Sequence, residues 1–369
     1  MVNGYGNLKH EIVDPDLCTL CGACETACPV NAISITADRN YQLFDCSENF
    51  DSCSICHEVC PHTAPNLDEA FKELSSAPYS LPGIGRFLTI RTARSNFEDI
   101  RHITRSGGVA AALSICGIET GLVDAVVSSE TKNLDDMPTP QKFKIPMVTD
   151  YLPSMLNVEF HPAAVAKAYD SVVKGYTRSR VAFIGLPCHM TALRKLQLFG
   201  HKSSEPLGFL ISRFCLWNPQ SMKAFSSLLR AKGVQLDTID EINLGDSIRL
   251  KSDVNAFDIP LAEIWECIRE GCRICMDFTG AFSDVSVGRV EGISKDWSVL
   301  IVRTKKGEEL VERAEREGYL ESANLPHAAE VGIRSIAFRK KALAKQEVYE
   351  SKRGVMAPGA FEIMERCIP

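Results

Sequence analysis

The sequence has little that would place it in a membrane or on a secretory route. No stretch of about 18 uncharged apolar residues occurs, and the longest candidate, Gly107 to Ile118, is too short and is followed by Glu119. Met1 to His10 lacks a basic segment followed by an apolar one, so no secretory signal is expected. We therefore expect a cytoplasmic protein with no transmembrane segment, for which peripheral docking on the cytoplasmic face of a membrane complex stays open.

Three further absences narrow the function. The net charge of −6 over 369 residues shows no general basic excess, which argues against a nucleic-acid binder. No G-x-G-x-x-G follows a predicted strand, so a Rossmann-type dinucleotide site is not indicated. The body of the chain shows no internal repeat and no low-complexity tract. The length is that of two or three domains.

Cysteine is what the sequence has in excess. Of the 15 cysteines, eight lie within the first 60 residues. In a reducing compartment, such dense spacing is typical of metal binding or redox chemistry and not of structural disulfides.

The first four cysteines form a compact motif. Cys18, Cys21, Cys24 and Cys28 follow the pattern C-x2-C-x2-C-x3-C-P, which is typical of bacterial ferredoxins. Three thiolates wrap one iron–sulfur cube and the fourth ligates a second cube. Small residues between the cysteines let backbone N–H groups approach the cluster sulfurs.

A second group repeats half of this motif. Cys53, Cys56 and Cys60 give C-x2-C-x3-C-P, and Cys46 precedes them by a gap stretched to six residues. Loop insertions of this size cost little free energy, so the cluster should survive. The crossed ferredoxin pattern assigns one cube to Cys18, Cys21, Cys24 and Cys60, and the other to Cys28, Cys46, Cys53 and Cys56. Zinc is the alternative, but zinc sites favour C-x2-C pairs separated by a longer spacer.

The remainder of the chain alternates strand-like and helix-like patterns, which predicts an α/β or α+β fold. We expect a two-cluster ferredoxin domain over 1–66, a linker over 67–86 and a mixed α/β domain over 87–369. The expected strands are Ala32–Thr36, Phe87–Thr92, Val123–Ser128, Val181–Gly185, Leu207–Ile211 and Val299–Thr304, the last followed by a charged helix. The expected helices are Pro162–Val173, Met190–Leu198 and Pro219–Ala231.

Three constellations in this body carry candidate chemistry. Ser106, Gly107, Gly108 and Val109 open a helical run, which fits either a phosphate-binding loop or a helix start with glycines for close packing. The turn Gly185-Leu-Pro187-Cys188 presents a cysteine where a helix begins, as a nucleophile, a metal ligand or a buried structural thiol. Cys272 and Cys275 form a C-x2-C after Cys267, and this pair needs two more ligands.

Cys188 and Cys215 follow predicted strand ends and are natural partners for Cys272 and Cys275 in a third [4Fe-4S] cluster. Zinc and a redox dithiol are the rivals at this site. The extra cysteine Cys267 competes with Cys215 for the fourth position. Cys116 and Cys367 are interpreted as ordinary free cysteines.

Taken together, the motifs resemble the coenzyme F420 hydrogenase/dehydrogenase β-subunit family from about Phe87 to Gly288. The resemblance rests on the Ser106-Gly-Gly loop, the Gly185-to-Cys188 turn with Ala-Leu-Arg-Lys-Leu behind it, and Cys272-x2-Cys275-x-Asp-Phe running on to Ser-Val-Gly. Family members with a fused ferredoxin segment are similar to F420H2 dehydrogenase input subunits of archaeal respiratory complexes in methanogenesis, and to the input half of F420-dependent sulfite reductase.

The resemblance implies a flavoprotein with FAD in a non-Rossmann site, where coenzyme F420 docks as substrate. It places Ser106, Gly107, Gly108, Val109, Gly185 and Pro187 at the cofactor, and assigns the third cluster to Cys188, Cys215, Cys272 and Cys275. It implies an oxidoreductase that passes electrons from F420H2 through FAD and the clusters to a partner protein or subunit, or in reverse. Because the cofactors carry the reaction, no catalytic side chain is named.

Other functions remain as alternatives. One is a ferredoxin-dependent flavin reductase of another substrate, since one scaffold serves several chemistries. Another is a pure iron–sulfur electron-relay subunit, and a third is a zinc-stabilised interaction or nucleic-acid module. The C-terminal stretch is locally basic, and we interpret it as a solvated helix face. The alternative is attraction to an anionic cofactor tail or an acidic partner. Its basic residues are Lys305, Lys306, Arg313, Arg316, Arg334, Arg339, Lys340, Lys341 and Lys345.

Overall fold

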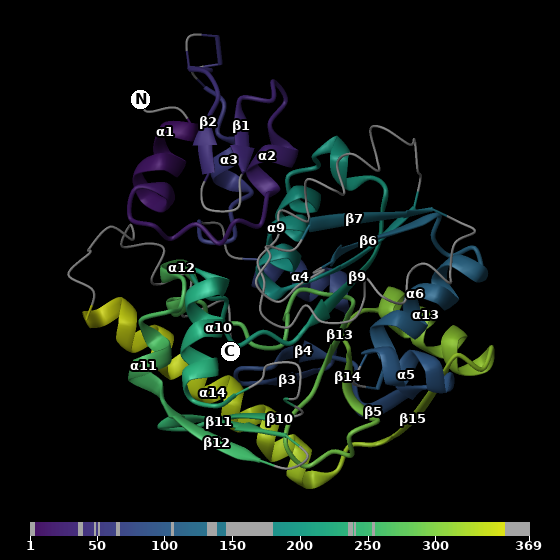
Figure 1. Ribbon diagram of the computed structural model, residues 1–369. Helices are drawn as coiled ribbons and strands as arrows, with labels where there is room; N and C mark the ends of the chain where they lie inside the picture. The colour runs from purple at the N-terminus through teal and green to yellow at the C-terminus, as the bar shows by residue number, and fades with distance from the viewer. Residues whose placement is uncertain are drawn as a thin grey trace.

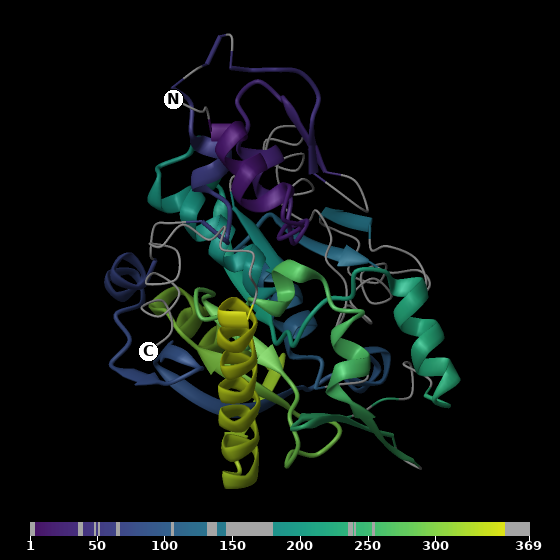
Figure 2. The same ribbon diagram turned by 90° about the vertical axis from the view of Figure 1, so that its left-hand side faces the viewer.

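The computed structural model describes residues 4–35, 40–47, 49–50, 52–63, 67–104, 107–130, 139–144, 180–234, 239, 241–252 and 255–350. The N-terminal segment lies at one end of the molecule, beside helix α9, and both views show it there (Figures 1 and 2). No helix in these ranges is long and apolar enough to cross a membrane.

The N-terminal segment consists of short helical turns and a small antiparallel sheet. Its irregular backbone fits its cysteine density, because short loops between ligands leave no room for long elements. The elements are α1 (Gly4–Leu8), the π-helix η1 (Lys9–Val13), α2 (Ala23–Ala27), β1 (Ile33–Ile35), β2 (Asn40–Gln42) and α3 (Ile55–Glu58).

The segment expected to be a linker carries regular structure. It holds α4 (Asp68–Ser75), β3 (Tyr79–Leu81) and most of β4 (Gly85–Phe87), and β3 and β4 pair as an antiparallel ribbon. Leu67 and Phe71 are buried in the core that the N-terminal segment shares with α9. The division of the chain into domains remains a prediction.

The body is built on an eight-stranded mixed sheet in the order β15-β5-β14-β13-β9-β8-β6-β7. Strands β6, β8, β9 and β13 run parallel, and the remaining neighbours pair antiparallel. The mixed α/β expectation is therefore confirmed. The bounds are β5 (Thr89–Ser95), β6 (Ala125–Glu130), β7 (Thr139–Lys144), β8 (Val181–Gly185), β9 (Leu207–Arg213), β13 (Val285–Gly288), β14 (Ser298–Val302) and β15 (Leu320–Asn324).

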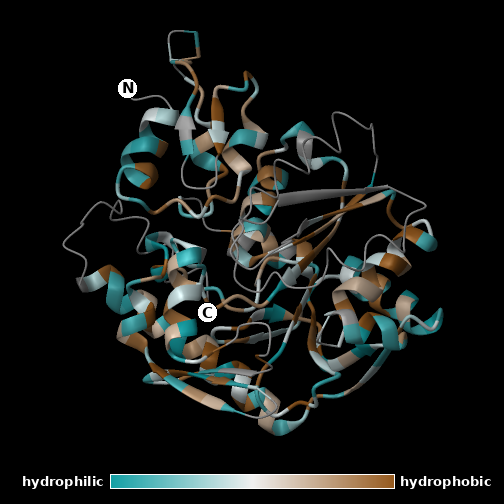
Figure 3. Ribbon diagram, viewed as in Figure 1, coloured by the Kyte–Doolittle hydropathy of each residue, from teal (hydrophilic) through white to brown (hydrophobic). Residues whose placement is uncertain are grey.

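Helices cover both faces of this sheet, so its central strands are apolar on both sides. Adjacent residues of one strand enter different cores: Ile184 packs toward α6 (Val109–Glu119) and α13 (Lys305–Arg316), whereas Phe183 packs toward α9 (Pro187–Leu198). Figure 3 shows hydrophobic residues gathered on the central strands and on the inward sides of these helices. The remaining helices near the sheet are α5 (Glu98–Thr104) and the 3-10 turn η3 (Lys202–Ser204).

A third core lies where the long helix α14 (His327–Glu350) packs against a three-stranded antiparallel sheet, and Figure 1 shows these elements in its lower left part. The helix contributes Ile333, Ile336 and Ala337 to this core; the last two lie about one helical turn after Ile333 on the same face, and all three are only 0 to 2% exposed. The other elements are β10 (Glu241–Leu244), β11 (Ser247–Lys251), β12 (Ala256–Pro260), α10 (Met222–Ala231), α11 (Leu261–Trp265) and α12 (Glu270–Arg273).

The predicted elements agree with these bounds within a few residues. The strand over Val181–Gly185 and the charged helix after β14 are confirmed. The helix expected from Pro219 begins later, at Met222, because the Ser221 hydroxyl accepts the Ala224 N–H as an N-cap. The helix expected over Pro162–Val173 lies outside the described residues.

Candidate metal and cofactor site

The structure brings Cys18, Cys21, Cys24 and Cys60 together as one set, which we call set I. Burial raises the pKa of the Cys24 thiol well above its ordinary value, and the charges of Cys18, Cys21 and Cys60 raise it further. Burial likewise raises the pKa of Cys18 to about 12. So many buried thiols in one place favour a cationic iron–sulfur core, which accepts them as thiolates and displaces their protons.

N–H groups point at the sulfurs of set I. The Leu20 N–H donates to Cys18 Sγ at 3.4 Å, and the side chain of Asn40 donates to Cys24 Sγ at 3.0 Å. Leu20 reaches this position with a left-handed backbone, at φ 57°, and Gly22 follows at φ 84°. These turns aim backbone N–H groups inward, and such donors stabilise negative charge on cluster sulfurs.

Cys28, Cys46, Cys53 and Cys56 form set II. Burial raises the pKa of Cys56 to about 12, and the charges of Cys53, Cys28 and Cys46 add to that effect. The Ala32 N–H donates to Cys28 Sγ at 3.1 Å, and the Gln42 side chain donates to Cys46 Sγ at 3.6 Å. The two sets follow the grouping that the crossed ferredoxin pattern predicts, and the assignment of their members as cluster ligands stays a prediction.

Set III lies in the body, at the carboxyl edge of the parallel strands. Cys188 follows β8 and Cys215 follows β9, and these strands are neighbours in the sheet. Burial raises the pKa of Cys188 well above its ordinary value, and the charges of Cys21, Cys215, Cys272 and Cys275 raise it further. Because Cys21 belongs to set I, sets I and III adjoin.

Cys267, the competitor of Cys215, lies apart from set III. Apart from burial, the groups that act on the Cys267 thiol are Glu266 and Arg273, not cysteines. The pKa of Cys215, in contrast, is raised to about 12, mainly by burial, and the charges of Cys272 and Cys275 contribute to this rise. Its sulfur also accepts a hydrogen bond from the Asn218 side chain at 3.6 Å. The geometry therefore favours Cys215 as the fourth member.

Cys116 is fully buried in the core between α6 and the sheet, and Cys367 lies outside the described residues. Within the described ranges, no three His, Cys, Asp or Glu side chains are placed to share one metal ion. A cube differs from a single ion in that each thiolate bonds to a different iron.

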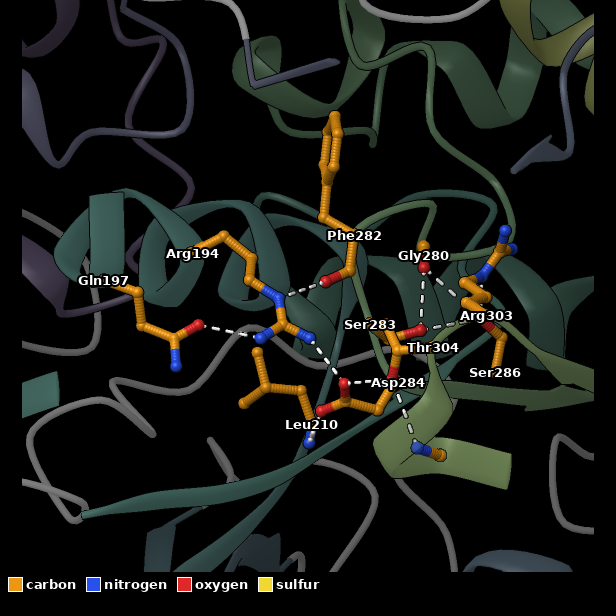
Figure 4. Close-up of polar contacts among 11 residues, drawn as sticks. Arg194, Gln197, Leu210, Gly280, Phe282, Ser283, Asp284, Ser286, Arg303 and Thr304 are labelled. Atoms are coloured by element: carbon orange, nitrogen blue, oxygen red, sulfur yellow. Dashed lines mark hydrogen bonds and ion pairs between the residues drawn. The ribbon is translucent and has the colours of Figure 1, made fainter. Parts of the chain in front are cut away.

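Two adjacent residues of α9 tie the sets to the rest of the fold. Arg194 points into the body, where it donates to Asp284 at 2.9 Å and to the Phe282 carbonyl at 2.8 Å (Figure 4). Lys195 points toward the N-terminal segment, where its ammonium donates to the Cys60 carbonyl at 2.5 Å and to Thr63. Both side chains are buried, so the helix that begins with Pro187 and Cys188 is held from two sides.

The loop between set III and β13 is fixed by further buried polar groups. The Asp277 carboxylate accepts the Gly280 and Ala281 N–H groups at 2.8 and 2.9 Å. Arg303, which directly follows β14, donates to the Ser286 hydroxyl, and this hydroxyl in turn donates to the Gly280 carbonyl (Figure 4). These bonds hold the backbone that follows Cys275 in one conformation.

The N-terminal segment also packs directly on set III. A Cβ at Gly271 would lie 2.0 Å from the Leu17 carbonyl oxygen, so only glycine permits this backbone contact. His201 Nε2 lies 3.1 Å from the Ala27 carbonyl on the other side of the contact. Set I and set III are therefore brought together by close packing and not by a single tether.

The glycine loop lies at the same edge of the sheet, and Ser106 is outside the described residues. The Gly107 N–H donates to the Ser298 hydroxyl at 3.1 Å, and a Cβ there would lie 2.8 Å from the Ala93 carbonyl. Gly108 begins α6 with φ 66°. Gly107 is thus required by close packing, and the assignment of this loop to FAD stays a prediction, as does that of Val109, Gly185 and Pro187.

Family models match most of this architecture. The model for the C terminus of the coenzyme F420 hydrogenase/dehydrogenase beta subunit matches residues 178–328, and the model for its N-terminal part matches residues 90–149. A 4Fe-4S binding domain matches residues 11–34. The chain belongs to the coenzyme F420 hydrogenase/dehydrogenase β-subunit family.

Similar proteins come from methanogens. The coenzyme F420-dependent sulfite reductase of Methanocaldococcus jannaschii is 28% identical over 84% of this chain and 48% of that protein, so the chain spans about half of it. The coenzyme F420 hydrogenase subunit β of Methanosarcina barkeri is 26% identical over 76% of this chain and 96% of the subunit. A chain of the F420-reducing [NiFe] hydrogenase complex from Methanosarcina barkeri shares the fold, with a TM-score of 0.65 and 22% identity over 74% of this chain and 95% of that chain.

One expectation about this member of the family is wrong. Lys340, expected on a solvated helix face, is 1% exposed and donates to the carbonyls of Cys215 at 2.8 Å and Asp277 at 2.6 Å, and to Cys275 Sγ at 3.7 Å. Burial alone would lower its pKa, but the negative charges of Cys275 and Cys215 raise it. The signal was in the sequence, because Lys340 continues the apolar helical stripe of Ile336 and Ala344.

Arg269 is a second buried cation that the sequence did not single out. It is 1% exposed. Burial raises the pKa of Cys18 of set I and of Cys272 of set III, and the positive charge of Arg269 partly opposes this rise in both. Two buried cations, Lys340 and Arg269, therefore act on members of set III, as expected where buried thiolates need compensating charge.

Proposed function

We propose that this chain is the coenzyme F420-linked electron-transfer subunit of an oxidoreductase, exchanging electrons between F420 and a partner protein through three [4Fe-4S] clusters. What supports it most is the gathering of the twelve cysteines into three sets of four, with sets I and III adjoining. The chain's family and its F420-linked relatives supply the substrate in this proposal.

The proposed ligands are the members of sets I, II and III, and each cluster, when bound, carries one electron at a time. FAD, when bound, accepts a hydride and returns single electrons. Side chains of the protein itself would keep the distances between the three sets constant. Arg194 and Lys195 fix α9 between the body and the N-terminal segment, and Asp277 fixes the loop after Cys275. Seven of the twelve proposed ligands are buried, and five are half-buried.

Metal analysis and an anaerobic absorption spectrum test this function. About twelve irons per chain, with matching labile sulfide, are expected for three cubes. F420H2 added to protein reconstituted with FAD should bleach the flavin and cluster absorption, and it should reduce an artificial acceptor. Zinc without labile sulfide would contradict the cluster proposal, and loaded clusters that F420H2 does not reduce would contradict the F420 proposal.

A pure iron–sulfur relay is the second candidate, and one observation favours it. The glycines of the 107–108 loop are accounted for by packing and backbone conformation, without any ligand. A relay would bind iron as above but would retain no flavin after reconstitution and gel filtration. Stoichiometric flavin on the purified chain would exclude it.

A further inference from the structure

Apolar side chains lie exposed beside set II, on the loop that follows β2. Leu43 is 56% exposed, Phe44 50% and Phe50 42%. We propose that Leu43, Phe44, Asp45 and Phe50, here called the loop patch, form the docking surface for a basic redox protein that exchanges electrons with set II. This proposal rests on the proposed function, in which set II holds a cluster.

The loop patch is connected to the ligands of set II by its backbone. The Phe50 N–H donates to the Cys46 carbonyl at 3.0 Å, and the Cys53 N–H donates to the Phe50 carbonyl at 3.1 Å. Asp45 precedes Cys46 directly, and the Leu43 N–H is anchored to the Ala32 carbonyl at 2.7 Å. A protein seated on these side chains would therefore lie against the cluster of set II.

The position of set II makes it the outer end of the proposed electron path. Set III adjoins set I through Cys188 and Cys21, and set I is continuous with set II through the short helices α2 and α3, which contact each other. Cys46 and Cys53 are both half-buried, whereas Cys18 is the one half-buried member of set I. Set III also has two half-buried members, Cys188 and Cys275, but it lies at the other end of the proposed path. Set II is therefore the more exposed of the two N-terminal sets, and it lies beside the exposed loop patch.

The stretched gap between Cys46 and Cys53 is explained by this role. Two residues suffice between the corresponding cysteines of the first motif, so wrapping a cube does not require six. The longer gap contributes Phe50 to the surface at the cost of leaving a large aromatic ring in water. Interfaces of electron-transfer proteins are small, so a few exposed apolar side chains are enough for one.

Charge decides which kind of partner fits. Residues 1–66 contain nine acidic and two basic side chains, a net charge of −7, whereas the whole chain carries −6 and the remainder therefore +1. Asp45 is exposed within the loop patch, where its carboxylate accepts the Ser47 hydroxyl at 2.6 Å and the Ser47 N–H at 2.8 Å. This acidic segment attracts a basic rim and steers its approach, while it repels a second copy of itself or an anionic lipid surface.

The test uses the full-length holoprotein, reduced with dithionite and freed of excess reductant. Cytochrome c serves as the basic one-electron acceptor, and the same protein with acetylated lysines serves as its charge-neutralised control. Stopped-flow rate constants should fall at least tenfold for the Leu43→Ser/Phe44→Ser variant and for Phe50→Ser. Asp45→Lys should lower the rate and flatten its dependence on salt. With acetylated cytochrome c as the acceptor, most of the difference in rate constant between Asp45→Lys and the parent protein should disappear.

Three controls keep the outcome interpretable. Phe338→Ser, which alters an aromatic side chain 69% exposed on α14, should leave the cytochrome c rate unchanged. Ferricyanide, a small acceptor that needs no docking surface, should oxidise the Leu43→Ser/Phe44→Ser and Phe50→Ser variants within about twofold of the parent rate. Iron content near that of the parent shows that set II still holds its cluster.

Loop-patch variants with full iron content that react with cytochrome c at the parent rate would overturn the proposal. The proposal would also be overturned if the parent protein dimerised through Phe44 and Phe50 in sedimentation experiments. Binding of the parent protein to anionic phosphatidylserine vesicles through these two residues would overturn it as well. Because dithionite supplies the electrons, failure of F420H2 as a donor would contradict the proposed function and leave the docking result standing.

Discussion

Replacing Lys340 by Met should lower the reduction potential of the cluster that we assign to set III. The Lys340 ammonium is buried and lies 3.7 Å from Cys275 Sγ, which puts it in direct contact with that set. A reduced cluster carries one more negative charge than an oxidised one, so a nearby positive charge favours reduction. Methionine keeps the length and apolar body of the side chain and removes the charge.

The size of the effect follows from this distance. At an effective dielectric constant of about 20, two unit charges 3.7 Å apart interact by about 4 kcal/mol. The added electron is spread over the whole cluster, so we expect roughly half of this, about 2 kcal/mol. For a one-electron couple that is about 85 mV, since a tenfold change in the equilibrium is about 59 mV.

The assay is a redox titration followed by electron paramagnetic resonance on the anaerobically purified protein. Lys340→Arg keeps the charge and should hold the potential near the parent value. Arg334→Met removes an exposed cation from the same helix and should also leave it unchanged. Lys340 further holds the carbonyls of Cys215 and Asp277, so iron analysis must show that Lys340→Met keeps its clusters. A fully loaded Lys340→Met protein whose potential moves by less than about 20 mV would refute the reasoning.

The same contacts support three further predictions. In an iron analysis, Cys215→Ser should lose about four of twelve irons, whereas Cys267→Ser should keep all twelve. Equal iron content in the two variants would contradict our choice of Cys215 as the ligand. Arg194→Met leaves the buried Asp284 carboxylate without its ion pair and should lower the free energy of unfolding in urea by about 3–5 kcal/mol; an unchanged midpoint would show that the pair contributes little. Lys195→Met should loosen the N-terminal segment, measured as faster amide exchange around Cys60, and exchange at the parent rate would contradict its anchoring role.

The grouping of the two cysteine motifs in the first 60 residues was predictable from spacing. Cys18, Cys21 and Cys24 are so close along the chain that few backbone paths can separate their sulfurs, and left-handed turns at Leu20 and Gly22 supply one path that joins them. The buried strand over Val181–Gly185 was also predictable from a local pattern, because a short unbroken apolar run is typical of a strand that is covered on both faces of a sheet.

The membership of set III depended on the tertiary structure. Cys188 and Cys215 are far apart in sequence and meet because β8 and β9 are parallel neighbours whose carboxyl ends share one edge. Cys267 is nearer than Cys215 to Cys272 along the chain, yet the charged groups that act on its thiol are Glu266 and Arg273 and not the cysteines of set III. Which of the two lies with Cys272 is a property of packing that the spacing left open.

The sequence by itself thus determined the local features: the kind of ligand, the two N-terminal motifs and the apolar strands, since each depends on residues within a few positions of one another. Only the tertiary structure decided the long-range ones: that Cys21 adjoins Cys188, that Lys340 contacts Cys275, and that Leu43, Phe44 and Phe50 stay exposed. The physical reason is that contacts between distant segments are set by how sheets and helices pack as a whole. A helical stripe can place Lys340 on a buried face, but it does not specify which distant group the ammonium meets.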